Sequence, residues 1–180
     1  NQIQQRDEAV STEWSEVLNQ YQRRADLIPN LVATAKASAS HEAEVFESIA
    51  DARAKIGSLT QVQNAPEDAQ TMQAFQQSQS ELSSAMSRLL VISERYPDLK
   101  ADQMFNNLMV QLEGTENRIA VARQRYVRAV QDYNLMIRQF PGSLTAKAMG
   151  YQRKENFQPE NVAQISTAPQ VDFSQPASAK

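Results

Sequence analysis

Residues 105–141 contain a row of mostly apolar side chains at heptad spacing, and this row constrains the fold more than any other feature. The steps between its members alternate between three and four residues. Such spacing keeps one stripe of a helix facing a neighbouring helix, here over about ten turns at about 3.6 residues per turn. The row predicts one long helix packed on a partner. Its members are Phe105, Leu108, Leu112, Thr115, Ile119, Ala122, Tyr126, Ala129, Tyr133, Met136 and Phe140.

Four amphipathic segments are predicted in residues 1–150. Apolar residues recur at helical spacing in each of them, and the 180 residues include only four glycines, which argues against a turn-rich β fold. Short connections between such helices predict an all-α protein, an up-and-down antiparallel four-helix bundle with long coiled-coil-like helices. The expected helices cover about residues 2–25, 29–56, 66–95 and 102–140.

The connection at Asp26-Leu27-Ile28-Pro29-Asn30 has two interpretations. Proline lacks an amide donor and disfavours the helical conformation of the residue before it. Either the chain turns here into an antiparallel partner, or one long helix kinks and continues. We favour the turn, because Asp26 can cap a new helix whose first turn tolerates Pro29. A two-stranded coiled coil, the alternative to the bundle, needs the continuous helix.

The composition changes at about residue 151. Prolines, glutamines and small polar residues follow with little periodicity. We expect residues 151–180 to form an extended, partly disordered tail that is partly draped on the bundle. Its large apolar anchors are Tyr151, Phe157, Val171 and Phe173.

Several kinds of reactive site are missing from the sequence. There is no cysteine, and the single histidine, His41, begins a His-Glu-x-x pattern that ends in Val45 instead of the second zinc-binding histidine. The scattered glycines form no phosphate-binding loop. A net charge of −3 does not suit a nucleic-acid binder. We therefore expect no catalytic, cofactor or metal site, no nucleic-acid partner, and a protein that is not an enzyme.

One candidate site lies inside the heptad row. Thr115 takes a position that an apolar core would give to leucine, and it is followed by Glu116, Asn117 and Arg118. Polar residues at such positions can set the register of packed helices through hydrogen bonds and ion pairs. The alternative is a patch that binds a ligand or a partner.

A second candidate site comprises Arg23, Arg24, Asp26 and Asn30. Helix capping and closure of the predicted turn explain these residues in structural terms. If the cluster binds something, its cations suit an anionic lipid headgroup or an acidic partner surface, although the nearby acids weaken that field.

Several motifs resemble those of the LemA family, and together they cover nearly the whole chain. The most distinctive is Tyr21-Gln-Arg-Arg-Ala-Asp-Leu-Ile-Pro-Asn-Leu-Val32. The others are Tyr96-Pro-Asp-Leu-Lys100, Thr115-Glu-Asn-Arg-Ile-Ala120, the run from Tyr133-Asn134 to Phe140-Pro141, and Pro169-Gln-Val-Asp-Phe173.

The resemblance implies a bacterial protein of the cell envelope, in which an N-terminal membrane anchor precedes an antiparallel helical bundle. Asn1-Gln-Ile-Gln resembles the start of the lipoprotein branch of the family, which implies an anchor just upstream of Asn1. The family has no settled biochemical role. The periplasmic side of the membrane is favoured, and the cytoplasmic side remains open.

Two functions follow as hypotheses. The first is a non-enzymatic, membrane-tethered helical scaffold or adaptor that binds a protein partner in the envelope or membrane. The second is a module that binds a lipid or a small molecule in a cleft between helices at Ala33–Ala39, with a pocket lined by Leu31, Ala35 and Phe46.

Overall fold

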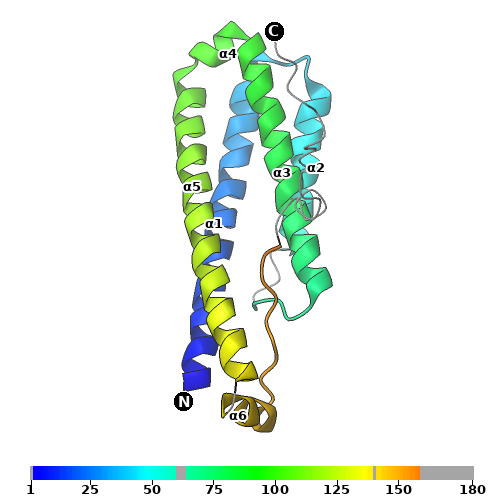
Figure 1. The fold of residues 1–180 in the computed structure, drawn as a ribbon. Helices are drawn as coiled ribbons and strands as arrows, with labels where there is room; N and C mark the ends of the chain where they lie inside the picture. Colours follow the sequence, from blue (N-terminus) through cyan, green and yellow to red (C-terminus); the bar gives the residue numbers. More distant parts are fainter. Residues whose placement is uncertain (1, 60–63, 140, 159–180) are drawn as a thin grey trace, which may run out of the picture.

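The computed structural model describes residues 2–59, 64–139 and 141–158 (Figure 1). These residues form helices and connections without any strand, so the predicted all-α class is confirmed for the described part of the chain. The helices are α1 (Gln2–Ser38), α2 (Ala43–Leu59), α3 (Ala69–Arg95), α4 (Pro97–Ala101), α5 (Gln103–Arg138) and α6 (Gly142–Met149).

The long helices are arranged in two antiparallel pairs. Figure 1 shows α1 beside α5 and α2 beside α3, and these pairs share the closest backbone contacts. The short α4 joins α3 to α5 at one end of the molecule. At the other end, α6 lies near the start of α1, and residues 151–158 return from it between α3 and α5.

The favoured turn at residues 26–30 is wrong, because α1 continues through Pro29 to Ser38. Its apolar stripe runs on without interruption through the buried Ile28 and Leu31. Proline deprives the carbonyl four residues earlier, that of Ala25, of its helical donor. Arg53 of α2 donates its Nε–H to that oxygen at 3.3 Å instead. The chain reverses at residues 39–42, so α1 and α2 replace the predicted helices 2–25 and 29–56.

The two helices predicted at 66–95 and 102–140 are present as α3 and α5, each preceded by an aspartate cap. Asp68 accepts a hydrogen bond from the backbone N–H of Gln70 (3.0 Å), and Asp102 accepts one from that of Phe105 (2.8 Å). The Gln70 amide lowers the pKa of Asp68 below its ordinary value, since it stabilises the carboxylate.

All members of the heptad row from Phe105 to Tyr126 are buried. Beyond Tyr126, the buried face of α5 no longer coincides with the row. Further along α5, Val130 is buried, whereas Ala129 and Met136 are only half-buried. A straight helix rotates by about 20° per heptad relative to a 3.5-residue repeat, so its buried face moves off a strict heptad row. Phe140, the last member of the row, lies outside the described residues.

The interior contains two apolar clusters that follow one another along the long helices. The upper one includes Leu31, Leu82 and Leu112, and the lower one is rich in aromatic rings, with Trp14 and Phe75 at its centre. Polar side chains occupy the level between them. We call this set the polar layer, and it consists of Arg24 of α1, Gln79 and Ser83 of α3, and Thr115 and Glu116 of α5.

Leu31, Ala35 and Phe46, which were expected to line a pocket, border neither of the two cavities described below for this part of the chain. All three side chains are buried in the upper cluster and pack in one continuous core. These three residues therefore belong to the hydrophobic core. The cleft of about 1320 Å³ is lined by other residues.

Candidate functional site

Arg24 is the centre of the polar layer. Its side chain is 2% exposed and its guanidinium reaches from α1 to two other helices. On α5 it donates to Glu116 Oε1 at 3.0 Å. On α3 it donates to Ser83 Oγ at 2.9 Å, and to the carbonyl oxygen and Oε1 of Gln79 at 3.3 and 2.5 Å. One arginine therefore links three helices at a fixed register.

The counter-charge of Arg24 is only partly buried. Glu116 is 43% exposed, so water screens the pair from one side. Within the described residues, Arg24 Nε has no hydrogen-bond partner, although the atom is buried. A buried N–H without an acceptor is costly, so this edge of the guanidinium favours an incoming acceptor, a water molecule or a ligand oxygen.

The structure joins two residues that the sequence placed in separate candidate sites. Arg24 belongs to the first-helix cluster and Glu116 to the heptad-row cluster, and they form an ion pair because α1 and α5 are neighbours. Thr115 is buried at the same level and donates to the carbonyl oxygen of Gln111 at 2.9 Å. Its hydroxyl is thus satisfied within its own helix.

The remaining candidates lie apart from this centre. Arg23, Asp26 and Asn30 are exposed on α1, where Asp26 accepts a hydrogen bond from Gln22 (2.8 Å). The main-chain oxygen of Asn30 accepts one from Thr34 (2.8 Å), as expected for a residue inside a helix.

Asn117 and Arg118 border a smaller cavity of about 360 Å³ between α1 and α5. Both are exposed, and the cavity also contacts the buried Gln20, whose Oε1 has no partner in the described structure. These two candidates therefore do not share a site with Arg24.

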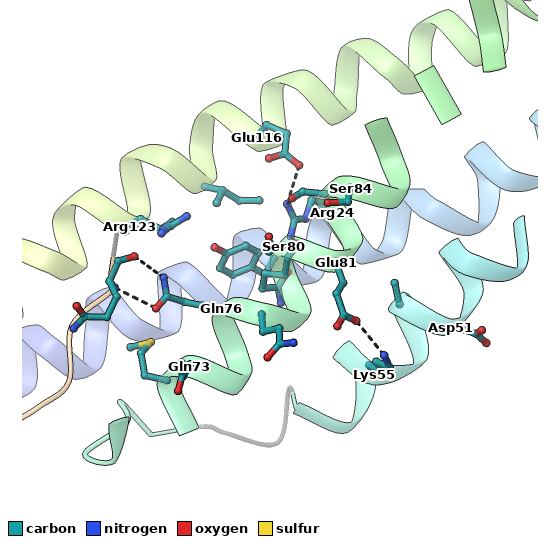
Figure 2. A pocket seen from close by; sticks show the side chains of 18 of the residues that line it. Arg24, Asp51, Lys55, Gln73, Gln76, Ser80, Glu81, Ser84, Glu116 and Arg123 are labelled. Carbon is teal, nitrogen blue, oxygen red and sulfur yellow. Dashed lines mark hydrogen bonds and ion pairs between the residues drawn. The ribbon is translucent and has the colours of Figure 1, made fainter. Parts of the chain in front are cut away.

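A large open cleft of about 1320 Å³ runs beside the polar layer. Figure 2 shows Arg24, Glu116 and Arg123 on one side of α3, and Asp51, Lys55 and Glu81 on the other. The lining is mostly polar, with the amides and hydroxyls of α3 prominent. Its α3 members include Gln73, Gln76, Gln77, Gln79, Ser80, Ser83 and Ser84.

Residues 151–158, which we call the strap, carry no helix and lie along α5. Side chains of the helices bind the strap backbone. Tyr133 and Tyr126 donate their phenol O–H to the carbonyl oxygens of Gln152 (2.7 Å) and Glu155 (3.0 Å). Asn134 binds both the carbonyl oxygen and the N–H of Lys154, each at 2.9 Å.

Further along the strap, the same kind of contact reaches α3. Gln76 donates to the carbonyl oxygen of Gln158 at 2.9 Å and accepts from its N–H at 3.1 Å. Asn156 of the strap donates to the carbonyl oxygen of Val127 at 3.1 Å. Gln76 on α3 and Asn134 on α5 therefore both bind the strap backbone through an amide side chain that donates and accepts together.

Phe157 fixes the strap to the lower apolar cluster. Its ring lies 5.4 Å from that of Tyr126 and 6.3 Å from that of Trp14, centroid to centroid. The guanidinium of Arg123 lies over the Phe157 ring, 4.6 Å from its centroid. Phe157, expected as an apolar anchor of the tail, thus takes part in aromatic and cation–π contacts.

Burial raises the pKa of three tyrosines, two that bind the strap and one that borders the cleft. Loss of hydration raises the pKa of Tyr133 to about 12 and raises the pKa of Tyr126 as well, which keeps both phenols protonated and able to donate to the strap. Burial also raises the pKa of Tyr21, although the nearby Arg123 and Arg24 guanidinium groups oppose that rise.

The strap-binding residues were not predicted as a site. Tyr126, Tyr133 and Asn134 sit on or beside the heptad row, where they would be interpreted as core residues. One signal in the sequence could have indicated the site. Each of these three side chains ends in a polar group at a position that faces the core, and buried polar groups usually need a hydrogen-bond partner.

Two further properties bear on function. Among the described residues, no group of three or more acidic, histidine or cysteine side chains is placed to hold a metal ion. The described helices also include none with the length and hydropathy needed to cross a membrane.

Comparison with known proteins gives one family and a few relatives. The model of the LemA family matches residues 13–173. Magnetosome proteins MamQ 1 and MamQ 2 of Paramagnetospirillum magneticum are each 34% identical over 74 residues, which is 41% of this chain and 27% of the relative. Magnetosome protein MamQ of Magnetospirillum gryphiswaldense is 32% identical over 73 residues, with the same two shares. The matches thus span about a quarter of these relatives.

Proposed function

This chain belongs to the LemA family, and we propose that it is a non-enzymatic, membrane-tethered scaffold or adaptor of the bacterial cell envelope that binds a protein partner. In this proposal, the helices form one up-and-down four-helix bundle, held to the membrane by an N-terminal anchor of the lipoprotein type. The bundle stands on the periplasmic side and presents its cleft to the partner.

One observation carries the proposal: beside the cleft, α3 and α5 already bind an extended segment of this chain, the strap, whose Glu155, Asn156 and Gln158 form part of the cleft wall. The strap is held by reciprocal amide contacts from Asn134 and Gln76 and by two buried phenols. Such contacts recognise a backbone without requiring a particular side chain. A protein segment is therefore the ligand class that this surface suits best.

The relatives support a structural role more than a reaction. They are named for the magnetosome, a cellular structure, and their names mention no substrate. The polar lining of the cleft favours a peptide over a lipid chain, because an apolar chain would leave those amides and hydroxyls without partners.

Pull-down from membranes tests the partner. The anchored, full-length protein is tagged in its own host, crosslinked gently and purified, and the matched control is the same tagged chain without its anchor. We expect one or a few envelope proteins to be enriched over the control. Failure to enrich any protein reproducibly would refute the adaptor role.

Protease treatment of spheroplasts tests the location. A periplasmic bundle is digested while the cell membrane is intact, and a cytoplasmic control protein survives. Protection of the bundle until the membrane is lysed would instead place it on the cytoplasmic side.

A further inference from the structure

We propose that α6 lies on the membrane that holds the N-terminal anchor, with its outer apolar side chains in the surface of the lipid bilayer. This contact rests on the proposed membrane tether, and it specifies which end of the helices faces the lipid. The occupant of the outer side of α6 is then a lipid bilayer and not a protein.

The inner side of α6 is fixed to the other helices. Ala146 is 3% exposed and belongs to the lower apolar cluster. Gly142 lies so close to the last turn of α5 that a Cβ there would collide with the carbonyl oxygen of Met136. The N–H of Tyr151 donates to the carbonyl oxygen of Ala146 at 3.0 Å and closes the end of the helix. α6 is therefore held in one orientation and has a definite outer side.

The outer side of α6 is uncharged and mostly apolar. Leu144 and Met149 are 60% and 57% exposed, and Thr145 and Ala148 are exposed as well. Residues four apart lie above one another on a helix, so Leu144 with Ala148 and Thr145 with Met149 form two adjacent rows. The charged residue of α6 is Lys147, in its last turn. A lysine at the border of such a surface can reach the lipid headgroups while its methylene groups stay along the apolar side chains.

α6 lies at the end of the molecule where the proposed anchor is attached. In Figure 1, α6 forms the tip of that end, near the start of α1. α1 is already helical at Gln2, and Ile3 shares the lower apolar cluster with Ala146. A chain spans at most about 3.3–3.6 Å per residue, so an anchor joined directly before residue 1 keeps this end at the bilayer surface. The exposed apolar side chains of α6 are then next to the lipid.

The ionisable side chains at this end carry both signs in equal number. Arg6 is paired with Asp132 at 3.1 Å, and Lys154 is paired with Glu67. The first two turns of α1, the last two turns of α5, α6 and the strap, together with Glu67, contain the cations Arg6, Arg138, Lys147, Arg153 and Lys154 and the acids Asp7, Glu8, Glu67, Asp132 and Glu155. Because these charges balance, apolar contact is the main attraction to the bilayer, and anionic lipids are not required.

The anchor and α6 act together. Two large apolar side chains are too few to hold the free protein on a bilayer, because association costs more freedom than their burial returns. The anchor removes most of that cost by keeping α6 at a high effective concentration beside the lipid. α6 therefore orients a protein that is already tethered, so that the long helices lead away from the membrane.

Quenching by nitroxide-labelled lipid tests the contact. The 180 residues contain no cysteine, so Thr145→Cys gives a single site for an NBD fluorophore on the outer side of α6. The matched control carries the label through Ala101→Cys, at an exposed position of α4 at the opposite end of the molecule. Each anchored, full-length protein is reconstituted in phosphatidylcholine vesicles that include phosphatidylcholine with a nitroxide on its acyl chain. We expect quenching at residue 145 to be about threefold stronger than at residue 101, with little change when phosphatidylglycerol is added.

Substitution of the exposed apolar side chains tests their role. Leu144→Gln combined with Met149→Gln should lower the quenching at residue 145 to the level of residue 101. Met104→Gln is the matched control, because Met104 is 64% exposed at the opposite end of the molecule, and it should leave the quenching at residue 145 unchanged. Circular dichroism checks that each variant keeps its helices.

Three results would overturn the contact of α6 with lipid. They are quenching at residue 145 no stronger than at residue 101, quenching that requires phosphatidylglycerol, and quenching that persists in the doubly substituted variant. A surface reserved for a partner protein or for residues 159–180 would give the first result, since the vesicles contain no partner. Flotation of the vesicles separates the two proposals. Protein that floats without quenching keeps the tether and loses the α6 contact, whereas protein that does not float loses both.

Discussion

Replacing Arg24 by lysine tests the polar layer most sharply, because the positive charge remains while the planar fork is lost. Within the described residues Arg24 forms four hydrogen bonds, two of them to Gln79 of α3 and one to Glu116 of α5. An ammonium group is a single point and cannot reach both helices at once. At least two bonds are lost, and each bond to a charged group contributes about 1.5–3 kcal/mol.

We therefore expect Arg24→Lys to lower the free energy of unfolding by about 3–5 kcal/mol, close to the cost of breaking a buried ion pair. The assay is urea denaturation followed by far-ultraviolet circular dichroism at neutral pH. Arg23→Lys makes the same chemical change one residue away on the exposed face, and it should cost less than about 0.5 kcal/mol. Equal stability of the two variants would show that Arg24 does not hold the helices together.

Three further predictions follow from the same packing. Leu112→Ala removes a buried side chain of the heptad row and should cost about 2–5 kcal/mol in denaturant unfolding, and so should Ile119→Ala; a change near zero would mean that the row faces solvent. Pro29→Ala should stabilise the protein by about 1–2 kcal/mol in the same assay, because alanine restores the helical N–H donor inside α1; a loss of stability would contradict this. The raised pKa of Tyr133 means that the folded state holds the phenol proton more tightly than the unfolded state, so the contribution of Tyr133 to stability should be constant below about pH 10 and fall as the pH rises towards 12. In Tyr133→Phe this alkaline loss should shrink, as thermal unfolding between pH 9 and 12 can show, and an unchanged loss would refute the assignment.

Much of the architecture could be predicted because helical periodicity depends on local sequence alone. The heptad row placed α5, and the helix expected at residues 66–95 begins within three residues of the start of α3. The prediction failed at Pro29, where a general preference of proline was overridden by tertiary contacts. A continuous buried stripe and the donor from Arg53 sustain the helix there, and neither is visible in the local sequence.

The error at Pro29 also hid the site. With a turn at residues 26–30, Arg24 would lie at the end of the bundle and could not meet Glu116 near the middle of α5. Once α1 is continuous, Arg24 falls at mid-length, level with Thr115. The cluster at Thr115 was the candidate for setting register, whereas the cluster of Arg24 was explained by helix capping and turn closure, and the ion pair joins the two into one layer. Asn117 and Arg118, on the exposed side of α5, take no part in it.

The strap was predictable only as a segment that packs on the bundle. Its side-chain signal, Phe157, indicated an apolar anchor. Its main attachment, however, is through backbone groups, which every residue carries and which leave no trace in the sequence.

Amide hydrogen exchange of the strap tests most directly the claim that the surface of α3 and α5 beside the cleft binds an extended backbone. The N–H groups of Lys154, Glu155 and Gln158 donate to Asn134 Oδ1, to the carbonyl oxygen of Pro66 and to Gln76 Oε1. We expect all three amides to exchange at least tenfold more slowly than in an unstructured peptide. In Asn134→Ala, the protection of Lys154 should be lost first. Exchange of all three amides at the unstructured rate would contradict the claim, because this surface would then hold no extended chain.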